Sequence, residues 1–436
     1  MNREDYLIDY IKMEKDYWAI DMGERLFVFH ALNGEPFIVE KSDLGDDYKN
    51  VEFEGIDDSV NKRKKITEVS EQYQKNYFGP TGIDLSVSEV CNLGCPMCFH
   101  NVALHNTCKR NITKLMSFEK AKEWIDYYIE YADEHRLPTY TFHIGSAEPF
   151  INKENLWKII SYIHQQTNGH PTDIFLNSNL TLIEEEDVLK IKKYGIHIFV
   201  GIDGLQQAND STRVYKADGR GTFEDIIQKV KLLIKNGVEV GVNITLTNDN
   251  FEKVDARETV DFFAELGIKS LLIDTDVVTH IKYNTKEIVD KLMDFTMYCD
   301  EKNMISYGSW RIPFNMLTAE NSATEPKSFC AARTGKNIVV TPSKGITFCT
   351  YSSKIMTPET DSPKAALELY TEEVRKMMSA TLPGKVEKCK GCALEGFCMG
   401  GCMLAHENHG ENNYMCDIYL EATRRLVRYY YSNYEE

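Results

Sequence analysis

The chain has 436 residues and is acidic: 50 Lys and Arg stand against 67 Asp and Glu, a formal net charge of -17. That balance argues against a nucleic-acid-binding protein, which needs a basic face. No apolar run reaches the length of a membrane span, and the first residues lack an apolar signal segment. We therefore expect a cytoplasmic protein with neither nucleic acid nor a membrane as a partner. Its 12 cysteines then favour metal ligation over disulfides.

Residues 1–80 form a preface of mixed character. An amphipathic start (Tyr6, Ile8, Ile11) precedes two strand-like runs at residues 26–29 and 36–39. Asn33-Gly34 between these runs is a hairpin signal. A charged helical pattern follows over residues 61–74, so the pattern predicts a small α+β unit.

Residues 81–324 alternate strand and helix patterns. Ser117 is the expected N-cap of the first long helix, and several glycines stand where helices should end: Gly169, Gly195, Gly237 and Gly267. Six β/α repeats with short connections predict a parallel sheet, either barrel-like or doubly wound. In such folds the chemistry lies at the C-terminal ends of the strands. The six strand-like runs are residues 83–87, 140–145, 174–177, 198–203, 238–246 and 270–274.

Cys91, Cys95 and Cys98 lie on one short loop after the first of these runs. Their CxxxCxxC spacing supplies three thiolates, whereas a [4Fe-4S] cluster normally takes four Cys ligands. Three ligands leave one iron open to a cofactor. Structural zinc, the alternative, usually takes four ligands in paired CxxC units. The spacing therefore favours a cluster with an open iron.

This triplet resembles the signature of radical S-adenosylmethionine (SAM) enzymes. The resemblance implies that the three cysteines bind a [4Fe-4S] cluster and that the amine and carboxylate of SAM chelate the fourth iron. It also implies a partial six-stranded (β/α) barrel, and the six repeats agree with that fold. In this family the cluster cleaves SAM to a 5'-deoxyadenosyl radical, which removes a hydrogen atom from an unactivated C–H bond.

The ends of the next three strands resemble the cofactor-binding elements of the same family. Residues 143–149 resemble its Gly-Gly-Glu-Pro element, with the second Gly replaced and one residue added, and Glu148 would accept a hydrogen bond from the ammonium group. Residues 177–179 stand where relatives carry Thr-Asn-Gly. Arg213, which follows a Ser-x-Asp-Gly-like element, either pairs with the SAM carboxylate or forms an ordinary surface ion pair. The expected cofactor-binding set is Gly145, Ser146, Ala147, Glu148, Asn177, Ser178, Asn179, Asp203 and Arg213.

Residues 325–436 are rich in cysteine and glycine and end in a predicted helix over residues 417–432. The cysteine spacing resembles the SPASM domain, a C-terminal extension that carries auxiliary [4Fe-4S] clusters; a zinc ribbon is the alternative. By this resemblance an outer cluster binds Cys389, Cys392, Cys398 and Cys416, and an inner cluster binds Cys330, Cys349 and Cys402. The inner set is one ligand short. Either Cys299 or Cys108 completes it, or both are buried or incidental thiols.

Proteins with a SPASM domain mostly modify peptides or proteins. Relatives that mature sulfatases carry an Asp just after the second SPASM cysteine as the proposed base, and here that residue is Thr350. The missing acid and the open inner iron favour a thioether cross-link in a ribosomally made precursor peptide, with a peptide thiolate on that iron. We expect a radical SAM oxidoreductase that receives electrons from a small donor such as flavodoxin or ferredoxin.

Two other functions stay open. One is sulfatase-type formylglycine formation or another radical dehydrogenation, and the other is a non-catalytic iron–sulfur electron carrier. The sequence assigns no catalytic side chain. Residues 1–80 are either a leader-peptide recognition module, which binds its leader by strand addition, or a cap that packs on the barrel.

Overall fold

The computed structural model of the chain describes residues 10–32, 34–44, 59–76, 79–99, 115–319, 328–342, 345–352, 357, 360, 362–410 and 414–432. Its largest element is a nine-stranded sheet with the strand order β11-β10-β9-β8-β7-β6-β5-β12-β13. The first eight strands of this order pair in parallel, and only β12 and β13 are antiparallel. The strands are β5 (Gly82–Ser88), β6 (Tyr140–Ser146), β7 (Thr172–Ser178), β8 (His197–Gly201), β9 (Val240–Leu246), β10 (Ser270–Thr275), β11 (Ile305–Tyr307), β12 (Asn337–Val340) and β13 (Ile346–Thr347).

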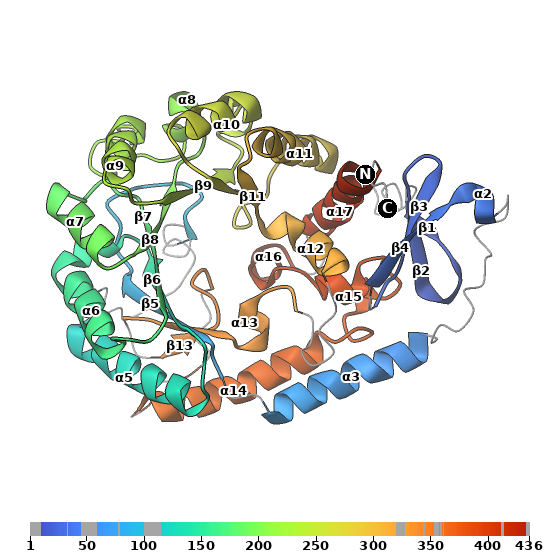
Figure 1. Cartoon of the computed structure of the whole chain (residues 1–436), viewed down its shortest axis with the longest axis horizontal. Coiled ribbons are helices and arrows are strands. Elements are labelled where there is room, and N and C mark those ends of the chain that lie inside the picture. The colour runs from blue at the N-terminus through green and yellow to red at the C-terminus, as the bar shows by residue number, and fades with distance from the viewer. Residues whose placement is uncertain are drawn as a thin grey trace.

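The curved sheet forms a partial barrel, as expected. Strands β5 to β10 stand in chain order and match the six predicted runs. Among the described strands no pairing joins the edge strands β11 and β13, so the barrel stays open. Figure 1 shows the helices along the outside of the arc and C-terminal segments inside it. The outer helices are α5 (Phe118–Glu134), α6 (Lys153–Gln166), α7 (Glu185–Lys193), α9 (Phe223–Lys235), α10 (Ala256–Glu265) and α11 (Thr285–Glu301).

Local signals in the sequence set the helix ends. The Ser117 hydroxyl accepts a hydrogen bond from the Lys120 amide at 3.2 Å, which confirms the predicted N-cap of α5. Gly195 and Gly237 follow α7 and α9 with φ of 61° and 78°, a conformation that glycine adopts without steric cost. These ends keep the β/α connections short and bring every strand end to the same edge.

A separate four-stranded antiparallel sheet precedes the barrel, in the order β1-β2-β3-β4. Strands β3 (Arg25–His30) and β4 (Gly34–Glu40) pair as the predicted hairpin, and β1 (Tyr10–Lys12) and β2 (Tyr17–Asp21) were not predicted. Helix α3 (Ser59–Asn76) covers the charged helical pattern, and α2 (Lys41–Leu44) follows the sheet. Asn33, Tyr6 and Ile8 lie outside the described residues. We call residues 10–32, 34–44 and 59–76 the N-terminal module.

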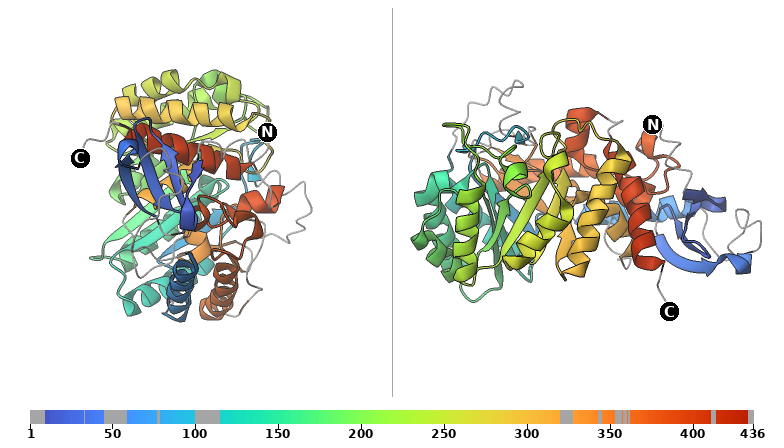
Figure 2. Two further views of the ribbon diagram at one scale, coloured as in Figure 1. Left: turned by 90° about the vertical axis from the view of Figure 1, so that its right-hand side faces the viewer. Right: turned by 90° about the horizontal axis from the view of Figure 1, so that it is seen from above.

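The C-terminal residues fill the space between the barrel and the N-terminal module. Helices α3 and α14 (Pro363–Ala380) run side by side, and α17 (Met415–Tyr431) matches the predicted last helix and lies beside the N-terminal sheet (Figures 1 and 2). None of the helices in the described residues is long and apolar enough to cross a membrane. The short helices are α8 (Gln206–Asn209), α12 (Ile312–Thr318), α13 (Ala331–Thr334), α15 (Glu395–Cys398) and α16 (Met403–His409), and the 3-10 turns are η1 (Glu14–Asp16), η3 (Pro149–Asn152), η4 (Phe251–Lys253), η5 (Ser309–Arg311) and η6 (Glu387–Cys389).

Candidate cofactor and metal-cluster sites

The loop with Cys91, Cys95 and Cys98 follows β5 at the C-terminal edge of the sheet. Its backbone is pinned to a neighbouring segment, because the Gly94 amide donates to the Val214 carbonyl at 2.8 Å and the Lys216 amide donates to Asn92 at 3.0 Å. Burial raises the pKa of Cys91 to about 11 and that of Cys95 to about 12. Cys98 adds to both shifts, so the three thiols share one neighbourhood.

In the part of the chain that the structure describes, no three His, Cys, Asp or Glu side chains converge on a single metal-ion position. The thiolates of an iron–sulfur cluster bind separate irons and stand farther apart than the ligands of one zinc ion. The CxxxCxxC spacing, and not this absence, is what favours a cluster over zinc at Cys91, Cys95 and Cys98.

Glu148 is completely buried and holds the next strand end together. Its Oε1 accepts from the Phe150 amide at 3.1 Å and from the Ser178 hydroxyl at 2.9 Å, and its Oε2 accepts from the Asn179 amide at 2.7 Å. Burial raises the pKa of this carboxyl to about 7, although the three hydrogen bonds lower it. A carboxylate offers about four acceptor positions, so one remains for a cation.

The backbone around Glu148 resembles a glycine-rich element even where glycine is absent. Ser146 has a φ of 93°, a conformation that glycine adopts at least cost. Ala147 and Glu148 donate their amides to the Ser88 and Val90 carbonyls at 3.1 Å each. Gly145 stands beside Asn177 of the next strand, since a Cβ there would lie 3.7 Å from the Asn177 side chain.

Asn179 connects this strand end to the cysteine loop. Its Nδ2 lies 3.6 Å from Cys91 Sγ and donates to Asn92 Oδ1 at 3.0 Å. The predicted residues at the ends of β6 and β7 therefore meet the predicted cluster loop in space.

Asp203 and Arg213 form a buried ion pair next to the same loop, with Nη2 of Arg213 2.8 Å from Oδ1 of Asp203. Gly201 makes room for the guanidinium, because a Cβ there would lie 2.4 Å from Arg213 Nη1. Desolvation lowers the pKa of Arg213. The negative charges of Asp203 and then of Cys95 raise it by more, so the net pKa is above the usual value. The Nε of Arg213 is buried and has no hydrogen-bond partner in the described structure. An unpaired buried donor beside three thiols fits an anionic cofactor group at this position.

The C-terminal cysteines fall into the two predicted groups. Burial raises the pKa of Cys398, and Cys416, Cys392 and Cys389 raise it further. These four residues line one pocket together with Glu395 and Tyr419. In the second group, burial raises the pKa of Cys349 to about 12, and Cys402 and Cys330 add to that shift.

Arg333 ties the two groups together. It follows Cys330 on α13 and donates to the Met399 carbonyl at 2.6 Å and to the Gly401 carbonyl at 2.5 Å. These carbonyls belong to the turn between Cys398 and Cys402. The buried guanidinium of Arg333 thus fixes the turn between Cys398 and Cys402 relative to the helix that follows Cys330.

Cys299 lies elsewhere. It is completely buried near the end of α11. Burial raises its pKa to about 12, Asp300 raises it further and Arg311 lowers it, and no other described cysteine contributes to the shift. This position favours a core thiol over a fourth inner ligand. Cys108 lies outside the described residues.

An acidic residue that the sequence did not single out stands beside the inner group. Asp84 of β5 is 9% exposed, its Oδ2 accepts from the Thr350 hydroxyl at 2.7 Å, and its Oδ1 is buried without a partner in the described structure. Burial raises its pKa to about 7. The expectation that no acid accompanies Thr350 is therefore incomplete: a strand 266 positions earlier supplies one. The one sequence signal for this position is the alternation in β5: Asp84 stands between Ile83 and Leu85, so its side chain points to the opposite face of the sheet from theirs.

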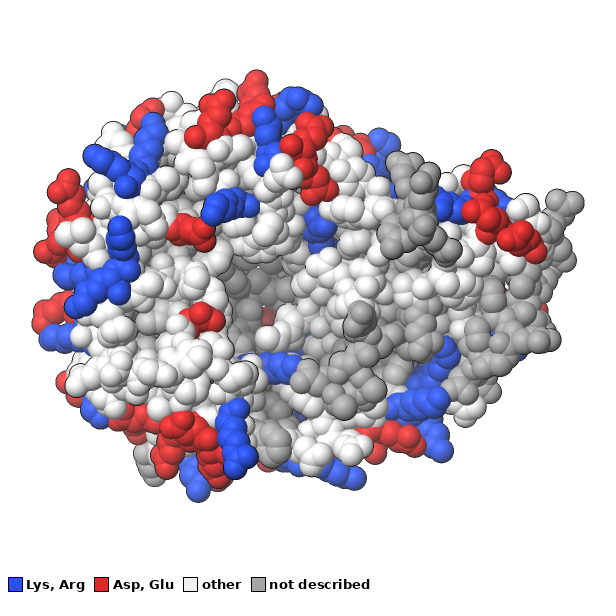
Figure 3. Space-filling view, in the orientation of Figure 1, with Lys and Arg blue, Asp and Glu red and all other residues white. Residues whose placement is uncertain are grey.

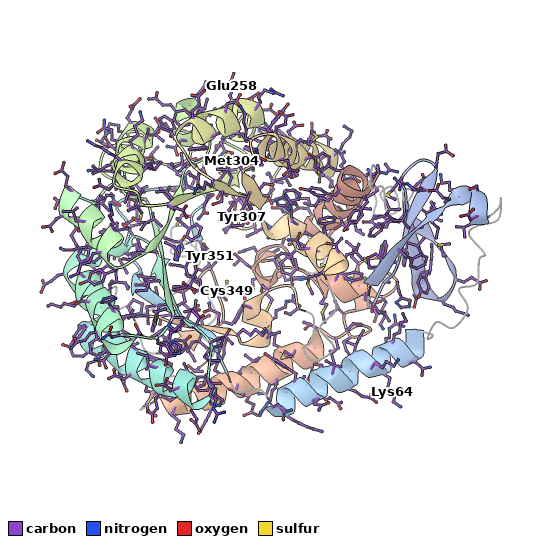
Figure 4. All side chains as sticks on the ribbon, viewed as in Figure 1. Lys64, Glu258, Met304, Tyr307, Cys349 and Tyr351 are labelled. Carbon is purple, nitrogen blue, oxygen red and sulfur yellow. The ribbon has the colours of Figure 1, made fainter. Side chains whose placement is uncertain are left out.

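Tyr351 projects into the space enclosed by the sheet. It is 55% exposed, yet desolvation raises its pKa to about 12, and Cys349, Asp84 and Cys98 raise it too. A side chain that enters a hollow surrounded by protein explains both observations. Figure 4 places Tyr351 and Cys349 inside the arc with Tyr307 across from them, and Figure 3 shows the surface hollowed at the middle of that face. Tyr351 is thus close both to Cys98 of the first cysteine loop and to Cys349 and Asp84 at the inner group.

Comparison with known proteins agrees with this arrangement. Residues 85–264 match the model of the radical SAM superfamily. The chain is 25% identical over 358 residues to the radical SAM cyclopropyl synthase TigE of Paramaledivibacter caminithermalis, a match that covers 79% of this chain and 73% of TigE. It is 29% identical over 190 residues to an uncharacterized protein of Methanocaldococcus jannaschii, covering 44% of this chain and 60% of that one.

Two solved structures share the fold. The enzyme anSMEcpe with bound AdoMet aligns with a TM-score of 0.64 at 17% identity, covering 81% of this chain and all of that chain (100%). SuiB of Streptococcus suis, bound to its precursor peptide SuiA, aligns with a TM-score of 0.58 at 16% identity, covering 90% of this chain and 95% of SuiB. The sheet, its open edge and the three-cysteine loop together lead to one conclusion: this chain contains a radical SAM domain built as a partial (β/α) barrel.

Proposed function

We propose that this chain is a maturase that oxidatively joins two positions of a ribosomally made precursor peptide. The observation that carries the proposal is the position of Tyr351 inside the arc of the sheet, close both to Cys98 of the first cysteine loop and to Cys349 and Asp84 at the inner group. SuiB was solved with the precursor peptide SuiA and anSMEcpe with the peptide Cp18Cys, which supports a peptide as the substrate class.

The strand-end residues are proposed to hold SAM. When bound, SAM and its [4Fe-4S] cluster supply a 5'-deoxyadenosyl radical that abstracts a hydrogen atom. Glu148 has one acceptor position left for the ammonium group, and a bound ammonium would lower its raised pKa. Arg213, oriented by Asp203, is proposed to face the SAM carboxylate with its unpaired Nε. Ser146, Asn177 and Asn179 line the same edge.

Joining two positions of a peptide removes two hydrogens. One would leave as an atom and the other as a proton, and an iron–sulfur cluster held by Cys330, Cys349 and Cys402 would accept the remaining electron. The Oδ1 of Asp84 is proposed to accept that proton, because it is an unpartnered carboxylate oxygen beside the inner group. Burial holds the pKa of Asp84 at about 7, which suits a general base near neutral pH.

The product that we propose first is a thioether. Cys330, Cys349 and Cys402 would hold three of the four positions of an inner [4Fe-4S] cluster, and among the described cysteines Cys299 lies apart, so one iron would be left for a peptide thiolate. The likeness to the cyclopropyl synthase TigE favours a second candidate, carbon–carbon ring closure. Asp84 serves both, since each product releases one proton. A base at Asp84 would also serve a sulfatase-type oxidation, so the preference for a cross-link rests on the three-cysteine inner group and not on a missing acid; a pure electron carrier gains no support from these observations.

The remaining parts of the proposal concern domains and partners. We infer a division into residues 1–80, 81–324 and 325–436, with auxiliary clusters in the last part and flavodoxin or ferredoxin as the electron donor. The N-terminal sheet has two outer strands, β1 and β4, and strand addition of a leader peptide needs such an edge.

Anaerobic reconstitution and co-expression test the proposal together. We expect about 12 irons per chain, four for each of three clusters, and the loss of two hydrogens from a short peptide encoded beside the gene. Alkylation of thiols separates the products, because a thioether consumes a cysteine thiol and a carbon–carbon ring does not. The contradicting outcome is that the enzyme forms 5'-deoxyadenosine but leaves the mass unchanged for every short peptide encoded near its gene.

A further inference from the structure

The pocket lined by Cys389, Cys392, Cys398 and Cys416 touches the N-terminal module directly. The Gly396 amide, in the middle of this cysteine loop, donates to the Ala31 carbonyl at 2.8 Å. The two backbones pass so closely that a Cβ on Gly396 would lie 2.0 Å from the Leu32 carbonyl oxygen. Because that neighbour is backbone, no side chain can be accommodated without moving one of the two segments.

An ion pair between a buried carboxylate and a partly exposed arginine makes a second connection. Glu395 lines the cysteine pocket and is 3% exposed, and its carboxylate accepts from the Gly384 amide at 2.6 Å and pairs with Arg63 of α3 at 3.1 Å. A buried carboxylate that loses its cation is strongly destabilised. The position of the loop between Cys392 and Cys398 therefore depends on a side chain of the N-terminal module.

The third connection reaches the other side of the pocket. The Tyr10 hydroxyl of β1 donates to the carbonyl of Leu420, another residue of the pocket lining, at 2.8 Å. Burial raises the pKa of Tyr10, and Cys392 raises it further, as expected when the phenol and this cysteine are close. In addition, the ring of Phe397 packs edge-on against Phe29 of β3, with centroids 6.1 Å apart.

We propose that the N-terminal module is a structural part of the outer cluster site, so that Ala31, Leu32, Arg63 and Tyr10 position the loop that carries its cysteines. The inference rests on the proposed cofactor content but not on the peptide chemistry. It assigns the module a task at the metal site that is separate from any recognition of a leader peptide.

The test measures iron in three variants of the reconstituted full chain. G396A introduces the Cβ that meets Leu32, and Y10F/R63Q removes both side-chain bonds from the N-terminal side without touching the cysteine loop. We expect iron to fall from about twelve to about eight per chain in G396A, the loss of one cluster, and to fall in the same direction in Y10F/R63Q. The matched control is K64Q, because Lys64 neighbours Arg63 but is exposed and, within the described part of the chain, pairs only with Glu68 at 3.9 Å (Figure 4). It should keep all its iron.

Two further readouts separate local from global effects. Production of 5'-deoxyadenosine from SAM and dithionite should stay within about threefold of wild type, since the first cysteine loop is untouched. Hydrogen exchange of the amides in β1 to β4 should accelerate in both variants. Full iron content in variants whose sheet exchanges rapidly overturns the proposal, because the site then forms without the module.

A reciprocal variant covers the case in which G396A and Y10F/R63Q do not fold. In C416A the outer cluster is lost, and we expect faster exchange of the Gly396 amide and of β3. Unchanged exchange there overturns the coupling. A wild-type chain with only about four irons defeats the proposed cofactor content instead, so the two failures are distinguishable.

Discussion

The two C-terminal cysteine groups differ in what surrounds them. The outer group has four cysteines around a pocket that Glu395, Tyr419 and Leu420 also line, and this pocket contacts the N-terminal module. The inner group has three cysteines and faces the barrel hollow, where Tyr351 is 55% exposed and Asp84 keeps an unpartnered oxygen. Four cysteines would ligand a cluster completely, which suits the electron transfer proposed for the outer group, whereas three cysteines beside a buried carboxyl suit the contact with substrate proposed for the inner group.

The largest loss of activity should follow from changes in the Cys91–Cys95–Cys98 loop and not from changes in either C-terminal group. Replacing Cys91, Cys95 and Cys98 by Ala should abolish 5'-deoxyadenosine formation under dithionite, because no other described site combines these thiols with Glu148 and Arg213. Changing the outer ligand Cys398 to Ala should leave this half-reaction intact. Persistent SAM cleavage by a soluble, iron-loaded triple variant would reject the assignment.

The contrast between the groups predicts a large effect of Asp84. D84N should lower peptide product about 100-fold or more, the usual contribution of a general base, while iron content and 5'-deoxyadenosine stay near wild type. Wild-type product formation should rise with pH through the raised pKa of Asp84, about 7, because the base acts when deprotonated. In T350V the bond that lowers this pKa is missing, so the rise should move to higher pH. Equal pH profiles for wild type and T350V would argue against Asp84.

A smaller effect is expected at the SAM edge. E148Q and R213A should each weaken SAM binding by about 1–3 kcal/mol, the range for hydrogen bonds to charged groups. Isothermal titration of the reconstituted protein measures this directly. T350V serves as a control, since Thr350 belongs to the inner group. If both edge variants bind as tightly as wild type, SAM lies elsewhere.

The smallest expected effect sharpens the claim that the inner group is open. C299A should keep its full iron content, because Cys299 is surrounded by Asp300 and Arg311 rather than by other cysteines. C349A should lose about four irons, one cluster's worth. A comparable loss in C299A would make the inner group a closed electron relay and would remove the main argument for thioether chemistry.

The sequence alone determined the elements whose signals are local. Alternation of strand and helix patterns predicted β5 to β10, and Ser117 and the glycines after the helices marked their ends, because capping and positive φ depend on single residues. The cysteine spacings predicted the radical SAM domain and the grouping of the C-terminal cysteines, since ligand spacing on a short loop limits which thiols can meet. Strands β1, β2, β11, β12 and β13 escaped prediction, and β1, β11 and β13 are only two or three residues long, too short to show an alternating pattern.

Only the tertiary structure decided what stands next to what across long distances in the chain. It curved the parallel sheet into an open barrel, a choice that periodicity cannot make because both folds bury the same strand pattern. It also placed Asp84 beside Thr350, and Ala31 against Gly396. Neither pairing has a sequence signature, because each joins residues whose local patterns are ordinary and whose contact depends on how the barrel, the cysteine loops and the N-terminal sheet pack together.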